Sequence, residues 1–241
     1  MFMHMYYGGY GMGFYWDPTY ILVLIGVVLT MAASACVNST YSKYARVRSM
    51  SGMTGAEAAQ RILSNAGLSY VRVEHIAGNL TDHYDPRSKV LRLSDTVYGS
   101  TSVAAIGVAA HECGHAIQDQ KSYMPLKFRS AFVPVANFGS KAAWPLIIIG
   151  LFLGSNQVLI QLGIICFSLA VLFQIITLPV EFNASNRAIR ILGDTGMLRQ
   201  DELKHTKKVL TAAALTYVAS AAAAILSLLR LILLFGRRDN D

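Results

Sequence analysis

The chain has 241 residues, of which 54% are hydrophobic and 15% charged, and its net charge is +7. Together with a mean hydropathy of +0.41, this composition excludes an ordinary soluble domain and favours an integral membrane protein. No nucleic-acid-binding motif accompanies the basic charge, so we expect it to reflect membrane topology and the lipid bilayer rather than a nucleic-acid partner. Three dispersed cysteines, Cys36, Cys113 and Cys166, predict no disulfide framework.

The N-terminal residues 1–18 are rich in Met, Tyr and Gly, and we interpret them as a flexible segment with interfacial aromatic side chains. A metal-trapping tail that uses His4 is the alternative. Residues 19–37 contain no charge and are long enough to cross about 30 Å of hydrocarbon. The sequence Ala33–Cys36 resembles a signal-peptide cleavage site, but no Lys or Arg precedes it. We therefore predict an uncleaved transmembrane anchor.

Residues 38–130 predict a cytoplasmic region with α and β elements. The run Thr54-Gly55-Ala56-Glu57 is a capping box that opens a predicted helix ending near Gly67. After a turn at Asp85–Arg87, residues Lys89–Leu93 alternate polar and apolar side chains and predict a short strand. This strand is a candidate for holding extended substrate by main-chain pairing, and a purely structural role is the alternative.

The most specific motif is His111-Glu112-Cys113-Gly114-His115, which lies in a predicted Ala- and Val-rich helix. At about 100° per residue, the two histidines lie about 40° apart on one helix face and can bind one metal ion. Cys113 lies about 200° from His111 and is a poor ligand candidate. A histidine pair that only forms hydrogen bonds is the alternative, but ionisable groups in an apolar helix are costly unless something pairs them. The motif therefore predicts zinc hydrolase chemistry.

Residues 131–180 predict a transmembrane hairpin. Its first arm is the weaker span because Asn137, Ser140 and Lys141 interrupt it, whereas Val158–Val180 has no charge. The polar run Ser155–Gln157 predicts the turn. A last span, Val209–Phe235, lies in the C-terminal region 209–241 and contains only Arg230. The sequence thus predicts a mainly α integral membrane protein with about four transmembrane helices.

The distribution of Lys and Arg predicts the orientation. The sequence has none in residues 1–37, eleven in 38–130, one in 131–180 and six in 181–208. The positive-inside rule then places both basic regions in the cytoplasm, and the N-terminus outside, of what we take to be a bacterial plasma membrane. Arg230, Arg237 and Arg238 would lie outside, so a tilted, re-entrant or flat last segment is the alternative.

Glu181 is the predicted third metal ligand, because a catalytic zinc takes three protein ligands and keeps one open position. It directly follows the third span, where Pro179 can open a helix, within the predicted third-ligand helix and linker 181–208. Two intervening spans return the chain to the side of the motif helix. The alternative is a surface ion pair of Glu181 with Arg187 or Arg190. Rival ligands in a more polar stretch are Asp194, Glu202 and His205.

Five ordered runs of this chain resemble the bacterial YugP-type membrane zinc metallopeptidases, and the likeness covers the chain from Asp17 onward. The resemblance implies a zinc metallopeptidase without identifying its substrate. The runs are Ser51-Gly52-Met53-Thr54-Gly55-Ala56-Glu57, Asp82-His83-Tyr84-Asp85-Pro86-Arg87, Ala109–Gln118, Pro179-Val180-Glu181-Phe182-Asn183-Ala184-Ser185 and Ala213-Ala214-Leu215-Thr216-Tyr217-Val218-Ala219.

The chain is more distantly similar to the HtpX and CAAX prenyl protease type of membrane gluzincin, which implies a zincin-like α+β region. Those enzymes use H-E-x-x-H plus a later E-x-x-x-D, and this chain has Ser185 where that Asp falls. Ser185 can form one hydrogen bond but supplies no charge to orient a histidine.

From these features we predict a zinc endopeptidase that acts on membrane or membrane-proximal polypeptides. One zinc per chain would activate water, with Glu112 as general base. Candidates for stabilising the developing oxyanion are His83, Tyr84, Tyr98 and Arg187. The alternative is a non-proteolytic membrane scaffold or metal-handling protein with bound zinc.

Overall fold

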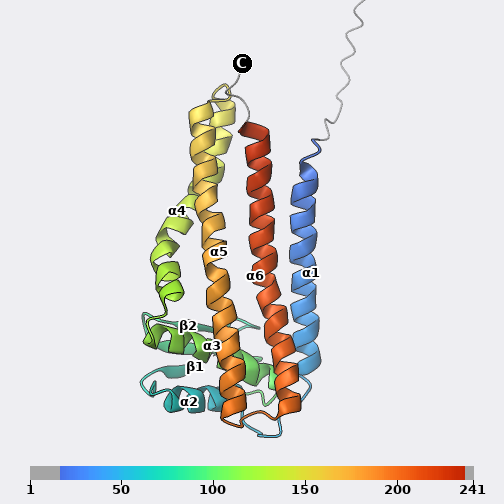
Figure 1. Ribbon diagram of the computed structural model, residues 1–241, viewed down its shortest axis with the longest axis vertical. Helices are drawn as coiled ribbons and strands as arrows, with labels where there is room; N and C mark the ends of the chain where they lie inside the picture. Colours follow the sequence, from blue (N-terminus) through green and yellow to red (C-terminus); the bar gives the residue numbers. More distant parts are fainter. Residues whose placement is uncertain (1–16, 237–241) are drawn as a thin grey trace, which may run out of the picture.

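The computed structural model describes residues 17–236, which form a bundle of four long helices above a smaller module (Figure 1). The long helices are α1 (Tyr20–Tyr44), α4 (Met124–Phe152), α5 (Gln157–Asp194) and α6 (Gln200–Phe235). The smaller module contains α2 (Gly55–Asn65), α3 (Val103–Gln120), β1 (Arg72–Ile76), β2 (His83–Asp85) and β3 (Val90–Ser94). The segment predicted to be flexible, residues 1–18, lies outside the described residues except for Asp17 and Pro18.

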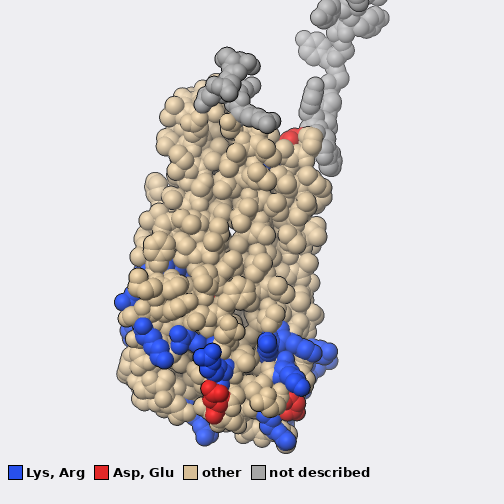
Figure 2. Space-filling view, viewed as in Figure 1, with Lys and Arg blue, Asp and Glu red and all other residues tan. Residues whose placement is uncertain are grey.

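All four long helices are long and apolar enough to cross a membrane. Figure 2 shows the upper part of the bundle almost without charge, whereas Lys and Arg gather around the end that carries the smaller module. The helices also continue beyond the apolar spans: α1 runs on to Tyr44, and α6 begins at Gln200. The prediction of a mainly helical protein with four candidate spans and a short β element is therefore confirmed.

Glu181 lies within a continuous helix. Pro179 was expected to open a new helix after the third span, but α5 runs unbroken from Gln157 to Asp194, so that expectation was wrong. Proline interrupts one main-chain hydrogen bond, which a long helix packed against neighbours tolerates. Glu181 is thus held rigidly by the helix of the span itself.

The α4–α5 hairpin packs closely through glycines. A Cβ atom added to Gly139 would lie 2.5 Å from the carbonyl oxygen of Cys166, and one added to Gly163 would lie 2.9 Å from that of Ala143. Small residues at such crossings let helix backbones approach in a membrane, where burial of apolar surface provides little driving force. The turn ends at Asn156, whose side chain accepts a hydrogen bond from the N–H of Leu159.

The last helix, α6, lies alongside α1 and reaches the same end of the bundle as the start of α1 (Figure 1). Arg230 is accounted for at that end: its Nη2 lies 3.4 Å from Oδ2 of Asp17, and its guanidinium lies 4.0 Å from the ring centroid of Tyr20. The continuous helix α6 has no re-entrant break and packs along α1, as a fourth span would. Arg237 and Arg238 lie outside the described residues.

The smaller module begins with the predicted capping box. Glu57 N–H donates to the Thr54 hydroxyl, and the Thr54 N–H donates to the Glu57 carboxylate, which starts α2. The sheet order is β1-β3-β2, with β3 parallel to β1 and antiparallel to β2. The strand predicted at Lys89–Leu93 is β3, Val90–Ser94. Because both of its edges are paired, β3 cannot hold a substrate strand; the edge strands are β1 and β2, and β2 is the one beside the motif helix.

The motif helix α3 is buried between α2, α5 and α6. Its Gly114 meets α5 so closely that an added Cβ would lie 2.7 Å from the carbonyl oxygen of Ala184. Gly107 meets α6 in the same way, 2.5 Å from Cγ2 of Thr206. These two glycines let α3 pass close to α5 and α6 at the end of the bundle that carries the smaller module. The contact at Gly114 brings His111 and His115 close to Glu181.

Candidate metal centre

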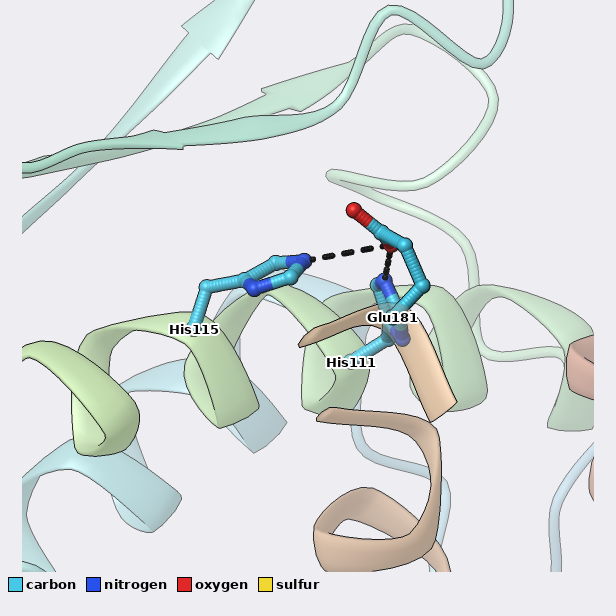
Figure 3. Close-up of side chains that lie close together, drawn as sticks. All are labelled: His111, His115 and Glu181. Atoms are coloured by element: carbon cyan, nitrogen blue, oxygen red, sulfur yellow. Dashed lines mark ion pairs between the residues drawn. The ribbon is translucent and has the colours of Figure 1, made fainter. Parts of the chain in front are cut away.

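Three side chains from two helices converge in the described part of the chain. His111 and His115 come from α3 and Glu181 from α5, and their possible ligand atoms all lie within 4.8 Å of one another (Figure 3). Oε2 of Glu181 lies 3.3 Å from Nε2 of His111 and 3.5 Å from Nε2 of His115. The Glu181 side chain is only 3% exposed. The residues chosen as ligands from the sequence are therefore neighbours in space.

The spacing of these atoms suits one zinc ion. Ligands at 2.0–2.2 Å in a tetrahedral shell lie about 3.3–3.6 Å apart, and Glu181 lies 3.3 and 3.5 Å from the two histidines. Oε2 of Glu181 is also buried and has no hydrogen-bond partner among residues 17–236. A buried, unpartnered carboxylate oxygen is costly, so this atom fits a metal ligand. The donor set, two imidazoles and a carboxylate, is that of a catalytic zinc site.

The hydrogen bonds of Gln118 determine which nitrogen of His115 faces Glu181. The amide nitrogen of Gln118 donates to the carbonyl of Val180 and to Oδ1 of Asn183, at 2.8 and 3.0 Å. Its oxygen must then accept, and it lies 3.0 Å from Nδ1 of His115. His115 therefore carries a proton on Nδ1, and in its neutral form Nε2 presents a lone pair toward Glu181.

The protonated form of His115 is stabilised when no metal is bound. Burial lowers the pKa of His115, but the carboxylates of Glu181 and Glu112 and the bond to Gln118 outweigh burial, so the net pKa is raised. A metal ion and a second proton would therefore compete for the same Nε2.

Ser185 lies beside the other histidine. Its hydroxyl oxygen is 3.1 Å from Nδ1 of His111, one helical turn after Glu181 on α5. The structure thus places Ser185 within hydrogen-bonding distance of a candidate ligand histidine. The contact is a neutral hydrogen bond, without the charge of a carboxylate.

Glu112 points toward β2. Its Oε2 accepts a hydrogen bond of 3.0 Å from the main-chain N–H of Tyr84. The Tyr84 hydroxyl instead donates to Asp119, which also pairs with Lys89. Burial and the bond to Asp119 raise the pKa of the Tyr84 hydroxyl, so it remains protonated at neutral pH. Tyr84 therefore contacts Glu112 through its backbone, while its side chain joins β2 to α3 through Asp119.

Two cavities flank the cluster. One, of about 250 Å³, is lined by residues of α1, α3, α5 and α6 and by two residues of the loop before β2, and the other, of about 280 Å³, lies between β2, α3, α4, α5 and α6. Asp82, Glu112, Glu181 and Tyr217 line both. Burial raises the pKa of Asp82, although its hydrogen bonds from Ser94 oppose the change. The cavities therefore border the cluster on two sides.

The other oxyanion candidates differ in whether they line the two cavities beside the cluster. His83 lines the second cavity, but its Nδ1 contacts the carbonyl of Thr81. Arg187 donates to Asn183 and lies over the ring of Tyr123, and it lines neither cavity. Tyr98 packs edge-on against His75 and also lines neither. Of these candidates, only residues of the 82–87 run line either cavity.

Sequence reasoning missed Arg129 and Tyr217 as site residues. Nη1 of Arg129, on α4, lies 3.5 Å from Oε1 of Glu181, and Tyr217, on α6, lines both cavities. Tyr217 falls in a run quoted for the family resemblance, which could have drawn attention to it. Nothing in the sequence around Arg129 singled it out.

The rival ligands do not join the cluster. Glu202 is buried and accepts hydrogen bonds from the N–H groups of Met50 and Arg199. His205 stacks on Tyr44 at 4.8 Å between ring centroids. Asp194 is the last residue of α5. The alternative for Glu181 was a surface ion pair with Arg187 or Arg190. Instead, Glu181 contacts the two histidines at 3.3 and 3.5 Å.

Comparison with known proteins agrees with the geometry. The profile of a family described as "Putative neutral zinc metallopeptidase" matches residues 19–236. The chain is 50% identical over 221 residues to a Bacillus subtilis (strain 168) protein named "Putative membrane protease YugP", covering 91% of this chain and 98% of that protein. No solved structure matches. The family match and this relative each span most of the chain, and the protein belongs to the neutral zinc metallopeptidase family.

Proposed function

We propose that this protein is a gluzincin-type, zinc-dependent membrane endopeptidase that hydrolyses peptide bonds in membrane or membrane-proximal polypeptides. His111, His115 and Glu181 would hold one zinc per chain. The observation that carries the proposal is the buried Oε2 of Glu181, which has no hydrogen-bond partner among residues 17–236 and faces Nε2 of both histidines at zinc-ligand spacing. Family membership supports the same assignment.

The chemistry follows from the neighbours of the ligands. Zinc, when bound, lowers the pKa of water from 15.7 toward about 7 and polarises a carbonyl. Glu112 would take the proton of the attacking water and pass it to the leaving amine. The main-chain N–H of Tyr84 positions the Glu112 carboxylate for both steps. Ser185 and Gln118 hold the two imidazole rings at their Nδ1 atoms.

Substrate would bind along the free edge of β2. The N–H of Tyr84 lies on that edge, because it donates to Glu112 and not to β3. An extended peptide added there would pass Glu112 and connect the two cavities. Tyr217, which lines both cavities, is our candidate for donating a hydrogen bond to the developing oxyanion, in place of the residues chosen from the sequence.

The membrane orientation is part of the proposal. The site lies at the basic end of the bundle, next to the smaller module, and the start of α1 lies at the opposite end (Figures 1 and 2). By the positive-inside rule, this arrangement supports a cytoplasmic active site and an outside N-terminus in a bacterial plasma membrane. A site at that depth suits polypeptide segments that enter or leave the bilayer.

The test is Glu112→Gln in purified, zinc-loaded protein. We expect cleavage of a peptide library to fall by about 10²–10⁴-fold, because the amide cannot accept the proton of water. Zinc content should remain at one per chain, since Glu112 is not a ligand. Unchanged cleavage would contradict the proposal. Metal flux into liposomes by wild-type protein that cleaves no peptide would support a metal-handling protein instead.

A further inference from the structure

A further hollow, of about 760 Å³, lies between α1 and α6. We call it the lysine pocket, and it shares no residue with the two cavities around Glu181. The α1 side supplies four residues and the α6 side supplies seven. They are Cys36, Thr40, Lys43, Tyr44, Lys204, His205, Lys207, Lys208, Thr211, Ala212 and Leu215.

The lysine pocket concentrates positive charge without compensation. Four lysines line it and no acidic residue does. None of the four forms an ion pair within residues 17–236, whereas Arg72, Lys89 and Arg92 of the sheet region all pair with carboxylates. Like charges held around one hollow repel one another unless an anion enters, so the pocket favours a negatively charged ligand.

The lysine pocket is also polar at one end and apolar at the other. On α6 it extends from Lys204 to Leu215, which is roughly 16 Å along a helix, and on α1 from Tyr44 back to Cys36, roughly 12 Å. The lysines lie toward the basic end of the bundle, and Cys36, Ala212 and Leu215 lie toward its apolar middle. A phosphate ion alone would occupy only the polar end.

Aromatic packing fixes the polar end. Tyr44 and His205 stack with their ring centroids 4.8 Å apart, and Nζ of Lys43 lies 5.5 Å from the Tyr44 ring centroid. Tyr44 is 5% exposed. These contacts join α1 to α6 and give the lysines a rigid base, as a preformed binding site needs.

We propose that the lysine pocket binds one anionic phospholipid, with its phosphate-bearing headgroup among Lys43, Lys204, Lys207 and Lys208. Its acyl chains would lie along the apolar surfaces of α1 and α6 that continue the pocket's helix faces, where Ile25 and Leu29 of α1 and Val218 of α6 are exposed. Figure 2 shows Lys and Arg gathered at one end of the bundle, and the pocket is lined by the end of α1 and the beginning of α6, which lie at that end. This site goes beyond the proposed peptidase function and does not depend on it.

Cys36 provides a direct reporter for the lysine pocket. It lines the pocket and is exposed, whereas Cys113 is buried, and Cys166 can be replaced by Ser. The full-length protein in detergent micelles would be labelled with a maleimide while phosphatidylglycerol or phosphatidylcholine is added. We expect phosphatidylglycerol to slow labelling about tenfold when its concentration is roughly ten times its Kd, and phosphatidylcholine to have little effect.

A matched pair of variants separates a site from diffuse attraction. Replacing the four pocket lysines by Gln should abolish the protection, with folding checked by circular dichroism. The control variant replaces four exposed basic residues outside the pocket by Gln and should retain the protection of Cys36 by phosphatidylglycerol. These residues are Arg46, Arg61, Lys121 and Lys127. Equal loss in both variants would overturn the proposal. Protection by inorganic phosphate or by an RNA oligonucleotide as strong as that by phosphatidylglycerol would overturn the lipid assignment.

Discussion

The upper bundle and the motif helix at its base are both packed through glycines, but the contacts have different consequences. In the bundle, Gly139 and Gly163 bring the backbones of two apolar helices together. At the base, Gly114 brings α3 against α5 and thereby places two histidines beside a buried glutamate. The same packing device serves stability alone in one region and the geometry of a reactive site in the other.

Tyr217 belongs to both regions, because it lies on a long bundle helix and lines both cavities at the site. If its hydroxyl donates to the oxyanion, Tyr217→Phe should lower kcat by about 10²–10³-fold and leave KM nearly unchanged. Steady-state peptide cleavage measures both constants. Tyr98→Phe is the control and should have wild-type kcat, because Tyr98 lines neither cavity. Equal kcat in the two variants would remove Tyr217 from the mechanism.

Gln118 tests the polar network at the base. It is fully buried, and Gln118→Leu would leave Nδ1 of His115, the carbonyl of Val180 and Oδ1 of Asn183 without this partner. We expect zinc affinity to fall by about 10–100-fold, because the ligand histidine loses its orientation. Competition with a chromophoric zinc chelator measures the affinity. Wild-type affinity would show that Gln118 does not orient His115.

The two glycine contacts can be compared by one substitution. Gly114→Ala and Gly139→Ala both place a Cβ against a carbonyl oxygen, at 2.7 and 2.5 Å, so each should lower the free energy of unfolding by about 1–3 kcal/mol. Only Gly114→Ala should weaken zinc binding, because it moves α3 away from Glu181. Thermal melts and zinc titration of both variants provide the test. Similar zinc affinities would contradict the different roles of the two contacts.

Ser185 should have the smallest effect. Ser185→Ala removes one neutral hydrogen bond to His111 and should weaken zinc binding by about tenfold, at the low end for such partners. Ser185→Asp supplies the carboxylate found in the distantly similar gluzincins and should bind zinc more tightly than Ser185→Ala. The chelator competition distinguishes these outcomes. If Ser185→Asp binds zinc no better than Ser185→Ala, a carboxylate at this position gives His111 no better support.

The sequence was informative where local pattern determines structure. Apolar run lengths predicted four candidate spans, the capping box predicted the start of α2, and helix periodicity placed His111 and His115 on one face. The choice of Glu181 came from counting spans and from its position at the end of one. These inferences need only the period of a helix, the thickness of a bilayer and the ligand number of zinc.

The remainder depends on contacts between distant segments. The pairing order of the strands made β1 and β2 the edges and β3 the centre, which the alternation in residues 89–93 could not reveal. Arg129 and Tyr217 reach the site from α4 and α6 because of how those helices cross, and no local pattern encodes that. Continuity of α5 through Pro179 likewise depends on neighbouring helices, which support the segment when one main-chain hydrogen bond is lost.

The most direct test of the account is the zinc coordination of the purified protein. Zinc content and X-ray absorption should give one zinc per chain with two imidazole nitrogens and a carboxylate oxygen at about 2.0–2.2 Å. In Glu181→Gln, the carboxylate contribution and most of the zinc should be lost, while the helical circular dichroism is retained. Full zinc occupancy with an unchanged absorption spectrum in Glu181→Gln would contradict the central claim that Glu181 completes the metal site.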